Sequence, residues 1–489
     1  MKKLAPLAAI LVLLAGCGGE PPLPVTALAV TPAPLVEAAP PAPVALPAVP
    51  VPSLPRAGVQ TFQGFPAEQV AYLVLDAATG EVLEEHNADA GLIPASTVKI
   101  VTAAGALAAL GPAYRFTTDL LATGSTAGGT LSGDLVLRGG GDPLLEERHL
   151  LALAARLREA GVRRVTGRFI VDDSALPLVP QLALEQPADE PYNAGVSALS
   201  VSFNRLELRR EGHGGPVYAV PPPGGGDLPP VRPNGTRSAV PVSDPALHAA
   251  GLFRRLAGGL GIALPPARRG IAPARTQLLA RHESPPVAEI VSGMLRYSNN
   301  QVATLLGLSA ARHLAGRPVP SADAASLLLA DLRRRLPGLP WHEAVLVDQS
   351  GLAEADRLSP RLLAGLLAAS RPGGALPPLL PLMAGSGLDG TLSRRLDRPE
   401  EALRVWGKTG TLAYATALAG YLLPEDGRPR AFALLIADPA RRALYLQQED
   451  MRAADRVAAP WREKARTLAD ALVARWLRPG TGLVAALSR

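Results

Sequence analysis

Hydrophobic and polar positions along the chain predict strands near both ends. Five segments have the length and apolar content of strands: 71–76, 81–84, 403–411, 415–423 and 431–438. Residues 77–80 form a turn between the first two, and helices are predicted over about 96–110 and 453–477. Because no regular helical crossovers separate the strands, they predict one antiparallel sheet built from both chain ends, with helices packed on it. The predicted fold class is therefore α+β.

The middle of the chain looks like a large β-rich insertion. Within it, 131–141 and 165–173 have strand patterns, whereas 214–235 is rich in Pro and Gly and is predicted to be a loop. The predicted organisation is a main domain interrupted by an inserted domain: 58–117 with 285–489, and 118–284.

Length and charge set the number of domains to expect and argue against one kind of partner. With 489 residues, 48% of them hydrophobic, the chain is long enough for two to four domains and a sizeable core. The net charge of +6 is mild for this length, and no basic stretch is interleaved with aromatic residues. Nucleic acid is therefore not an expected partner.

The first residues indicate export rather than fold. Lys2 and Lys3 precede a short apolar run, 4–16, which is typical of a signal peptide and too short to span a membrane. Leu14-Ala15-Gly16-Cys17 resembles the bacterial lipobox, so 1–16 is predicted to be removed and Cys17 to carry lipid. The alternative is an ordinary signal peptide with an incidental cysteine. Gly18, rather than aspartate, after Cys17 favours the outer membrane.

The segment 17–57 is predicted to be a lipid-anchored tether. Residues 21–55 contain 12 prolines and a single charged residue, Glu37. Polyproline geometry would give this stretch a reach of about 100 Å. Since Cys17 is the only cysteine, disulfide and zinc–cysteine chemistry are excluded from the exported protein.

The basic residues are unevenly divided, with 44 Arg and only 5 Lys. Beyond the predicted signal, lysine remains at three positions. Lys99 lies in Ser96-Thr97-Val98-Lys99, Lys408 begins Lys408-Thr409-Gly410, and Lys464 belongs to the C-terminal helix, where a surface position is expected. Two such motifs on three lysines arise by chance on the order of one time in a thousand.

The first motif has the spacing of a serine nucleophile and its base. Residues at i and i+3 share a helical face, so the Lys99 amine can lie near the Ser96 hydroxyl. A serine hydroxyl needs an adjacent base to become a good nucleophile. Lysine can act as that base because burial or a nearby cation lowers its pKa, whereas arginine stays protonated. As isolated matches, the serine could be a helix cap and the lysine a solvated residue.

A third motif lies between the other two. Ser298-Asn299-Asn300 fits the S-x-N pattern of penicillin-recognising serine enzymes. Its middle residue is Asn where Asp is commoner. The preceding residue leaves a second register open, because Tyr297-Ser298-Asn299 also fits Y-x-N and would make Tyr297 and Asn299 the functional pair.

Together these motifs resemble the D-alanyl-D-alanine carboxypeptidase/endopeptidases of the class C low-molecular-mass penicillin-binding proteins. The similarity runs from about residue 60 to 475 and includes the sequences around the motifs. The matching flanks are 92–95, 110–118, 139–143, 165–174, 282–286, 348–352 and 388–392. The resemblance implies a penicillin-binding/β-lactamase-like serine transferase fold with an inserted domain. It also favours the S-x-N register.

The resemblance implies an acyl-enzyme mechanism on peptidoglycan stem peptides, with β-lactams as covalent inhibitors and neither a metal nor an organic cofactor. Ser96 would attack the D-alanyl carbonyl, with Lys99 as its base. Ser298 would pass a proton to the leaving amine, and Asn300 would hold Lys99 and the substrate amide. Lys408 would lower the pKa of Lys99 and attract the substrate carboxylate.

The resemblance also implies supporting binding groups. Thr409 and Gly410 would flank the substrate beside Lys408, and backbone N–H groups of Ser96 and Thr411 would form the oxyanion hole. In the insertion, the acidic pair Asp189-Glu190 is a candidate for holding a substrate amino group.

Three hypotheses remain open from the sequence. The first is a peptidoglycan carboxypeptidase, endopeptidase or both. The second is a β-lactamase of the same fold, although no glutamate-bearing deacylation motif of the class A kind is found after Ser298. The third is a wall-binding lipoprotein without catalysis, which the presence of Ser96, Lys99 and Lys408 argues against.

Overall fold

The computed structural model describes residues 62–210, 217–220 and 239–478. In this part of the chain, the main sheet has six strands in the order β16-β17-β18-β19-β1-β2, and each neighbouring pair is antiparallel. Its strands are β1 (Val70–Asp76), β2 (Val82–His86), β16 (Ala384–Gly385), β17 (Val405–Leu412), β18 (Ala415–Leu422) and β19 (Arg430–Ala437). Because β1 pairs with β19, the sheet joins both ends of the described chain, as the sequence predicts.

One face of this sheet packs against helices, some of which carry functional motifs. These helices are α1 (Val98–Leu110), α4 (Val287–Tyr297), α5 (Asn300–Ala315), α6 (Ser321–Arg335) and α7 (Pro360–Ala369). Their apolar side chains share one core with Leu73, Tyr421 and Leu435 of the sheet. Short 3-10 helices join the elements around this core: η2 (Ala95–Thr97), η5 (Trp341–Glu343), η6 (Leu380–Leu382) and η7 (Gly390–Leu392).

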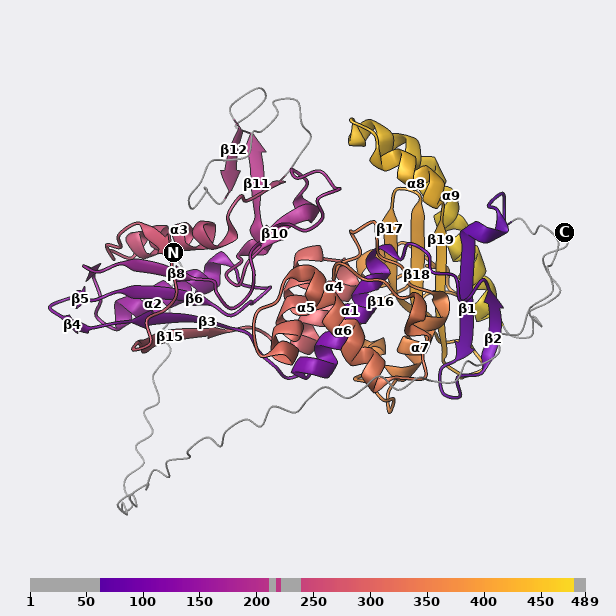
Figure 1. The fold of residues 1–489 in the computed structure, drawn as a ribbon, viewed down its shortest axis with the longest axis horizontal. Helices are drawn as coiled ribbons and strands as arrows, with labels where there is room; N and C mark the ends of the chain where they lie inside the picture. Colours follow the sequence, from indigo (N-terminus) through magenta and orange to yellow (C-terminus); the bar gives the residue numbers. More distant parts are fainter. Residues whose placement is uncertain (1–61, 211–216, 221–238, 479–489) are drawn as a thin grey trace, which may run out of the picture. The chain divides into compact units, whose positions relative to one another are not determined.

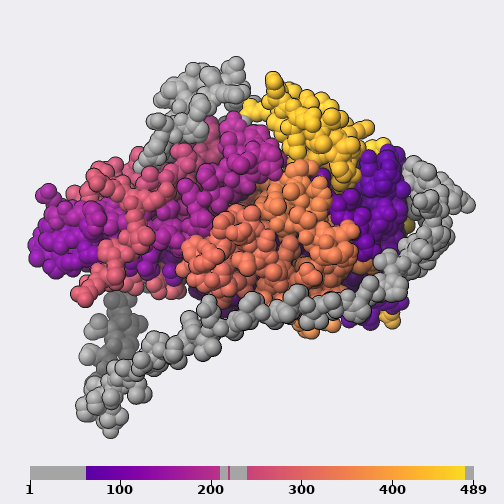
Figure 2. Space-filling model, viewed as in Figure 1, coloured from indigo at the N-terminus to yellow at the C-terminus, as the bar shows by residue number. Residues whose placement is uncertain are grey.

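The opposite face of the sheet is covered by the C-terminal helix α9 (Met451–Leu477), which follows α8 (Pro439–Leu446) (Figure 1). Alternate sheet residues such as Tyr72, Phe432 and Leu434 pack with Trp476 of α9 in a second core. Figure 2 accordingly shows the yellow C-terminal helix beside the indigo N-terminal strands. The short helix η1 (Ala67–Gln69) leads into β1.

A separate five-stranded sheet forms from the described residues of the insertion, in the order β14-β8-β6-β3-β15. Its strands are β3 (Thr117–Ala122), β6 (Leu135–Gly139), β8 (Phe169–Asp172), β14 (Ala267–Arg269) and β15 (Gln277–Glu283). The helices α2 (Glu147–Glu159) and α3 (Pro245–Gly259) share a core with one face of this sheet. This separate core makes the insertion a packed body with its own apolar interior, consistent with the β-rich insertion that the sequence predicts.

The insertion also contains shorter strands. They are β4 (Ser125–Ala127), β5 (Thr130–Ser132), β7 (Arg164–Val165), β9 (Val179–Gln181), β10 (Ala194–Val196), β11 (Arg205–Arg210), β12 (Val217–Val220) and β13 (Ala239–Pro241), with η3 (Pro191–Asn193) and η4 (Ser202–Asn204) between some of them. They form three small sheets: β4-β5-β7, β9-β10 and β12-β11-β13. The loop between β9 and β10 contacts Asn300 of the motif between α4 and α5.

Three local predictions in the insertion differ from the structure in part. The strand predicted over 131–141 is divided between β5 and β6, because Gly133 lies so close to Thr123 that a Cβ there would be 2.0 Å from its carbonyl oxygen. The strand predicted over 165–173 is likewise divided between β7 and β8. Of the predicted loop 214–235 only 217–220 is described, as strand β12, and its other residues lie outside the described part of the chain. Short apolar runs predict strands without showing where close backbone approach interrupts them.

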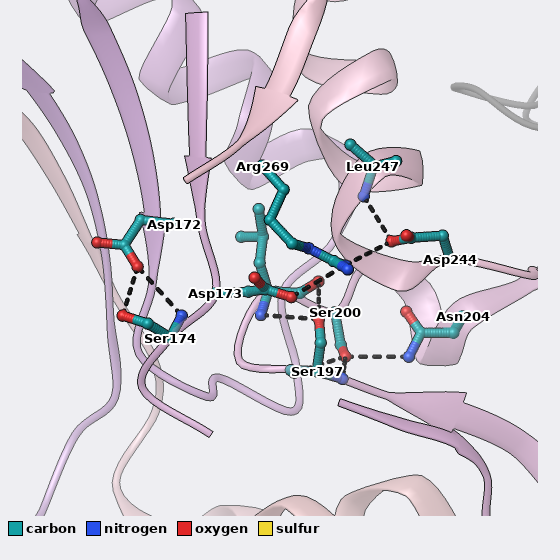
Figure 3. Close-up of polar contacts among 10 residues, drawn as sticks. Asp172, Asp173, Ser174, Ser197, Ser200, Asn204, Asp244, Leu247 and Arg269 are labelled. Atoms are coloured by element: carbon teal, nitrogen blue, oxygen red, sulfur yellow. Dashed lines mark hydrogen bonds and ion pairs between the residues drawn. The ribbon is translucent and has the colours of Figure 1, made fainter. Parts of the chain in front are cut away.

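Polar contacts hold the insertion together next to β10 (Figure 3). Arg269 of β14 forms ion pairs with Asp173 and with Asp244, the N-cap residue of α3. Nearby, Asn204 donates to Ser200 Oγ at 3.0 Å and to the Gly195 carbonyl oxygen at 2.7 Å. This second network fixes the start of β10, directly after the loop that reaches the functional motifs.

The predicted signal (1–16), the tether (17–57) and Cys17 lie outside the described residues. Among the residues that are described, no helix is both long enough and apolar enough to cross a membrane.

Candidate active site

Ser96 lies in η2, at the entrance to α1 and against β17. The residue before it, Ala95, has a φ of 46°, a left-handed conformation that non-glycine residues rarely adopt. Two glycines make room for this segment: a Cβ on Gly351 would lie 1.9 Å from the Ala95 carbonyl oxygen, and one on Gly410 would lie 2.7 Å from the Pro94 carbonyl oxygen. The backbone around Ser96 is therefore held from two sides by close approach of other loops and strands.

Lys99 is fully buried one helical turn beyond Ser96. Its Nζ lies 2.9 Å from Ser96 Oγ and donates to Asn300 Oδ1 at 2.7 Å and to the Ser350 carbonyl oxygen at 2.6 Å. Burial lowers the pKa of the Lys99 amine to about 7, although the carboxyl groups of Asp348 and Asp356 act in the opposite direction. An amine with this pKa can accept a proton from Ser96 near neutral pH.

The loop that supplies the Ser350 carbonyl is organised by Asp348. Its carboxylate accepts hydrogen bonds from the backbone N–H groups of residues 350–353 and from the Ser350 hydroxyl. Asp356 is buried beside it and accepts from the Val347 N–H at 2.9 Å. Burial, with the neighbouring Asp348 charge, raises the pKa of Asp356 well above its usual value. This pair therefore places two acidic groups near Lys99, and their charges oppose the effect of burial on the Lys99 pKa.

Ser298 and Asn300 lie on either side of the junction between α4 and α5. Ser298 caps α4 with a φ of 60°, and its Oγ accepts a hydrogen bond from Lys408 Nζ at 2.8 Å. Asn300 begins α5, where its Oδ1 accepts from Lys99. The left-handed turn thus directs two polar side chains of one motif toward two different lysines.

The residues of the alternative register have other surroundings. The Tyr297 side chain is 70% exposed. Asn299 is the N-cap of α5, and its Oδ1 accepts from the Val302 N–H at 3.0 Å. Asn299 therefore has a helix-capping contact of the usual kind, whereas Ser298 and Asn300 contact the two lysines.

Lys408 is also fully buried, on β17. Besides Ser298, its amine donates to the Thr409 carbonyl oxygen at 2.6 Å. Burial and the nearby Lys99 charge lower the pKa of Lys408 well below its usual value. A positive charge on Lys99 thus disfavours a second one on the buried Lys408 amine.

The rest of the third motif continues along β17. Thr409 Oγ1 donates to Thr391 Oγ1 of η7 at 2.9 Å, Gly410 is buried against the Ser96 segment, and Thr411 is exposed. The structure thus forms two hydrogen-bonded groups, Lys99 with Ser96 and Asn300, and Lys408 with Ser298. The Lys99 charge acts on Lys408. Thr409, Gly410 and Thr411 form the strand beside these groups.

Comparison with known protein families shows to which family the chain belongs. The model of the D-Ala-D-Ala carboxypeptidase 3 (S13) family matches residues 59–220 and 225–459. The chain belongs to this family. The match spans the sheet, the insertion and all three motifs, in agreement with the resemblance found in the sequence.

Individual S13 relatives support the same relationship. The chain is 25% identical over 414 residues to the D-alanyl-D-alanine carboxypeptidase DacB of Haemophilus influenzae, covering 75% of this chain and 85% of that one. It is 31% identical over 386 residues to the carboxypeptidase DacB of Mycolicibacterium smegmatis, covering 74% and 75%. A D-alanyl-D-alanine carboxypeptidase from an Actinomadura species is 29% identical over 73% of this chain and 75% of its own length.

A solved structure shows the same fold. Penicillin binding protein 4 from Haemophilus influenzae superposes with a TM-score of 0.67 at 23% identity, covering 83% of this chain and 96% of that one. The same protein has also been solved in complex with a β-lactam, with a TM-score of 0.64 to this chain. The α+β fold with an inserted domain is thus that of a penicillin-binding protein.

Sequence reasoning missed three contacts of this S13 site. The Ser350 carbonyl binds Lys99, Thr391 binds Thr409, and the Tyr192 carbonyl of the insertion accepts from Asn300 Nδ2 at 2.9 Å. Two of these groups are backbone carbonyls, which every residue type carries, so no sequence pattern marks them. The sequence gives one indirect signal for Ser350 and Thr391, because both lie in flanks that resemble the family, 348–352 and 388–392.

The acidic pair of the insertion faces a basic side chain of the main domain. Glu190 and Asp189 face Arg452 at the start of α9, with nitrogen–oxygen distances of 3.6 and 4.0 Å. Lys464 is exposed, as predicted, and its amine lies 5.3 Å from the centre of the Phe65 ring.

Proposed function

We propose that this chain is a serine D-alanyl-D-alanine carboxypeptidase, with or without endopeptidase activity, that cleaves peptidoglycan stem peptides through an acyl-enzyme on Ser96. The observation that carries the proposal is the contact of Ser96 Oγ with the buried Lys99 amine, whose pKa is lowered to about 7. A hydroxyl one hydrogen bond from a deprotonatable amine is an activated nucleophile. S13 membership supplies the reaction class.

Acylation begins when the neutral Lys99 amine takes the Ser96 proton. Ser96 Oγ then bonds to the D-alanyl carbonyl carbon, and the negative charge develops on the carbonyl oxygen. The N–H groups of Ser96 and Thr411 are the proposed donors to that oxygen. Since Lys99 is held by Asn300 and the Ser350 carbonyl, its amine stays beside Ser96 throughout.

Breakdown of the tetrahedral intermediate needs a proton on the leaving amine. Ser298 is the proposed carrier: its hydroxyl gives a proton to the leaving amine while its Oγ takes one from the Lys408 amine bound to it, and the proton that Lys99 took from Ser96 keeps the site's total unchanged. Its contact with Lys408, and that of Asn300 with Lys99, support the S-x-N register over a Tyr297/Asn299 pair. Water then hydrolyses the ester and regenerates the Ser96 hydroxyl.

The substrate's terminal carboxylate is proposed to bind along β17. On this strand Gly410 borders the Ser96 segment, Lys408 and Thr409 directly precede it, and Thr411 is exposed. A β-lactam offers a carboxylate and a strained amide to the same groups, so it should acylate Ser96 and inhibit the enzyme.

The first test is labelling with a fluorescent penicillin. A stable covalent adduct with the wild type, absent from the Ser96→Ala variant, is expected. Rapid hydrolysis of nitrocefin instead would indicate a β-lactamase. If the protein is neither labelled nor able to release D-alanine from a pentapeptide, the proposal of a non-catalytic wall-binding protein replaces this one.

The second test separates two activities. The protein is incubated with purified muropeptides and the products are weighed by mass spectrometry. Loss of one terminal alanine marks a carboxypeptidase, and conversion of cross-linked dimers to monomers marks an endopeptidase. A product set unchanged by the Ser96→Ala substitution would contradict both.

We further propose that the enzyme is exported to the periplasm and held at a membrane, with the outer membrane favoured, by lipid on Cys17. The lipobox-like sequence Leu14–Cys17 and the proline-rich segment after it support this. A Cys17→Ser variant should move from the membrane fraction to the soluble periplasmic fraction. Recovery of that variant with membranes would contradict the anchor.

A further inference from the structure

The orientation of the Asn300 amide is fixed from two sides. Its Oδ1 accepts from Lys99 at 2.7 Å, and its Nδ2 donates to the Tyr192 carbonyl at 2.9 Å. The oxygen and nitrogen ends of an amide have similar size, so packing alone does not choose between them. If the amide turned over, its NH2 would face the Lys99 amine and its oxygen would face a carbonyl. The Tyr192 carbonyl therefore keeps the acceptor end of Asn300 on Lys99.

This carbonyl comes from the loop of residues 182–193, which joins β9 to β10 and is called here the inserted loop. Tyr192 and Asn300 are 108 positions apart in the chain, so only non-covalent contacts can bring them into register. Gln301, the residue after Asn300, makes such a contact. Its Nε2 donates to the Pro191 carbonyl at 2.9 Å, and its side chain is 2% exposed. Two successive residues of α5 thus bind two successive carbonyls of the inserted loop.

The inserted loop has internal contacts that let it act as one unit. Asn193 is buried, accepts from the Ala183 N–H at 2.8 Å and donates to the carbonyls of Ala183, Gln186 and Pro187. At its other end, Glu185 Oε1 accepts from the Glu354 N–H of the main domain at 2.9 Å. Because these contacts make the loop one rigid unit, a shift of Pro191 also shifts Tyr192.

We propose that Gln301 is a positioning residue of the acylation step, which holds the inserted loop so that the Tyr192 carbonyl orients Asn300 toward Lys99. The inference rests on the proposed function, because it concerns the same Ser96–Lys99 pair. It gives the insertion a part in the catalytic machinery in addition to any contact with substrate. Gln301 acts through Asn300 rather than on the reacting atoms.

The first experiment measures the rate of acylation by a fluorescent penicillin. Gln301→Leu keeps the side-chain volume but removes the donor, and acylation is expected to slow about tenfold. Gln301→Asn, too short to reach Pro191, should slow it likewise and serves if the leucine variant does not fold. The matched control is Gln69→Leu, which removes a single hydrogen bond, to Asp438, in η1. It should be acylated at the wild-type rate.

The decisive experiment is a double-mutant cycle with Asn300→Ala. If Gln301 acts through Asn300, then Asn300→Ala and Asn300→Ala/Gln301→Leu are acylated equally slowly. Independent effects that multiply would overturn the proposal, as would a Gln301→Leu variant acylated as fast as the wild type. An unlabelled wild type, or labelling that persists in Ser96→Ala, would instead overturn the proposed function itself.

Discussion

Two lysines with no exposed side-chain surface form the chemical centre of the site, in a chain where arginine is almost nine times as frequent. An arginine at either position would keep its charge in a dry interior, whereas a lysine can lose its proton. Burial lowers the pKa of both amines, and each is bound to a serine hydroxyl. The scarcity of lysine elsewhere is what makes these two positions visible in the sequence.

The lowered pKa of Lys99 predicts a pH dependence of acylation. The amine can accept the Ser96 proton only when it is itself unprotonated, so acylation should rise with pH around a midpoint of about 7. Acylation by a fluorescent penicillin, followed below and above that midpoint, measures this. Lys99→Arg should lose about a hundredfold to ten-thousandfold of the rate. A wild-type rate that is flat across neutral pH would contradict the assignment of Lys99 as the base.

The raised pKa of Asp356 predicts a change in stability that depends on pH. The folded state binds this proton more tightly than the unfolded state does, so ionisation costs stability as pH rises from the unfolded pKa through the folded one. Asp356→Asn keeps an acceptor for the Val347 N–H without the ionisable group. Its free energy of unfolding should exceed that of the wild type, and by more at pH 8 than at pH 5. Chemical denaturation at the two pH values tests this; an advantage that is larger at pH 5 would contradict it.

Close packing at Gly351 predicts a large loss of activity on adding one methyl group. In Gly351→Ala, a Cβ would lie 1.9 Å from the Ala95 carbonyl oxygen at a φ of +80°, so the Ser96 segment must move. A displacement of this size at a nucleophile costs roughly a hundredfold in acylation rate. Gly258→Ala in α3 is the control, because nothing lies within 4 Å of its added Cβ. Equal rates in the two variants would show that the Ser96 segment tolerates the shift.

At the scale of elements, helix α9 depends on one acidic residue of β2. Glu84 accepts from Tyr72 Oη at 2.8 Å and from Trp476 Nε1 at 3.1 Å, and it also forms an ion pair with Arg475. These contacts fix the last turns of α9 against the sheet. They also satisfy polar groups that would otherwise be buried against an apolar core.

Removal of Glu84 should therefore weaken the fold without touching the site. Glu84→Ala leaves the Tyr72, Arg475 and Trp476 donors without this acceptor, which should lower the free energy of unfolding by about 2–3 kcal/mol. Denaturant unfolding measures the loss. Glu463→Ala, which breaks an exposed ion pair with Arg466 on the same helix, should cost less than about 1 kcal/mol. Similar losses in both variants would contradict a specific part for Glu84.

The elements that sequence predicts well are those with long, uninterrupted patterns. Strands β1, β17, β18 and β19 and helices α1 and α9 lie close to their predicted ranges. The two-residue strand β16 is too short to leave a pattern, and β5 and β6 are separated by a close approach at Gly133 that only the folded chain reveals. The motif residues were found because their side chains carry the chemistry. The contact of Gln301 with Pro191 joins residues 110 apart through a backbone carbonyl, so no pattern could predict it.

At the scale of the whole molecule, the main sheet joins residues that are far apart in the chain. Every residue of β1 pairs with β19, more than 350 positions later. The site has the same character, since Lys99 contacts residues 201 and 251 positions further along the chain. Such non-local pairing slows folding, because long loops must close before their contacts form.

The distribution of lysines over the folded molecule predicts a selective reaction with amine-directed reagents. Among the described residues, lysine occurs at 99, 408 and 464, and of these side chains Lys464 alone is exposed. A soluble N-hydroxysuccinimide ester should therefore modify Lys464 in the native protein and all three positions after denaturation. Peptide mapping by mass spectrometry checks the sites. Native modification at Lys99 or Lys408 would show that the site opens to solvent.

The isolated position of Lys464 has a practical consequence. It projects from α9, on the face of the main sheet opposite to the face covered by α1 and α5. Coupling through this amine would attach the described part of the protein to a bead or sensor surface with the side that carries α1 and α5 turned outward. The arrangement that places deprotonatable amines in the interior thus also provides a defined handle for immobilisation.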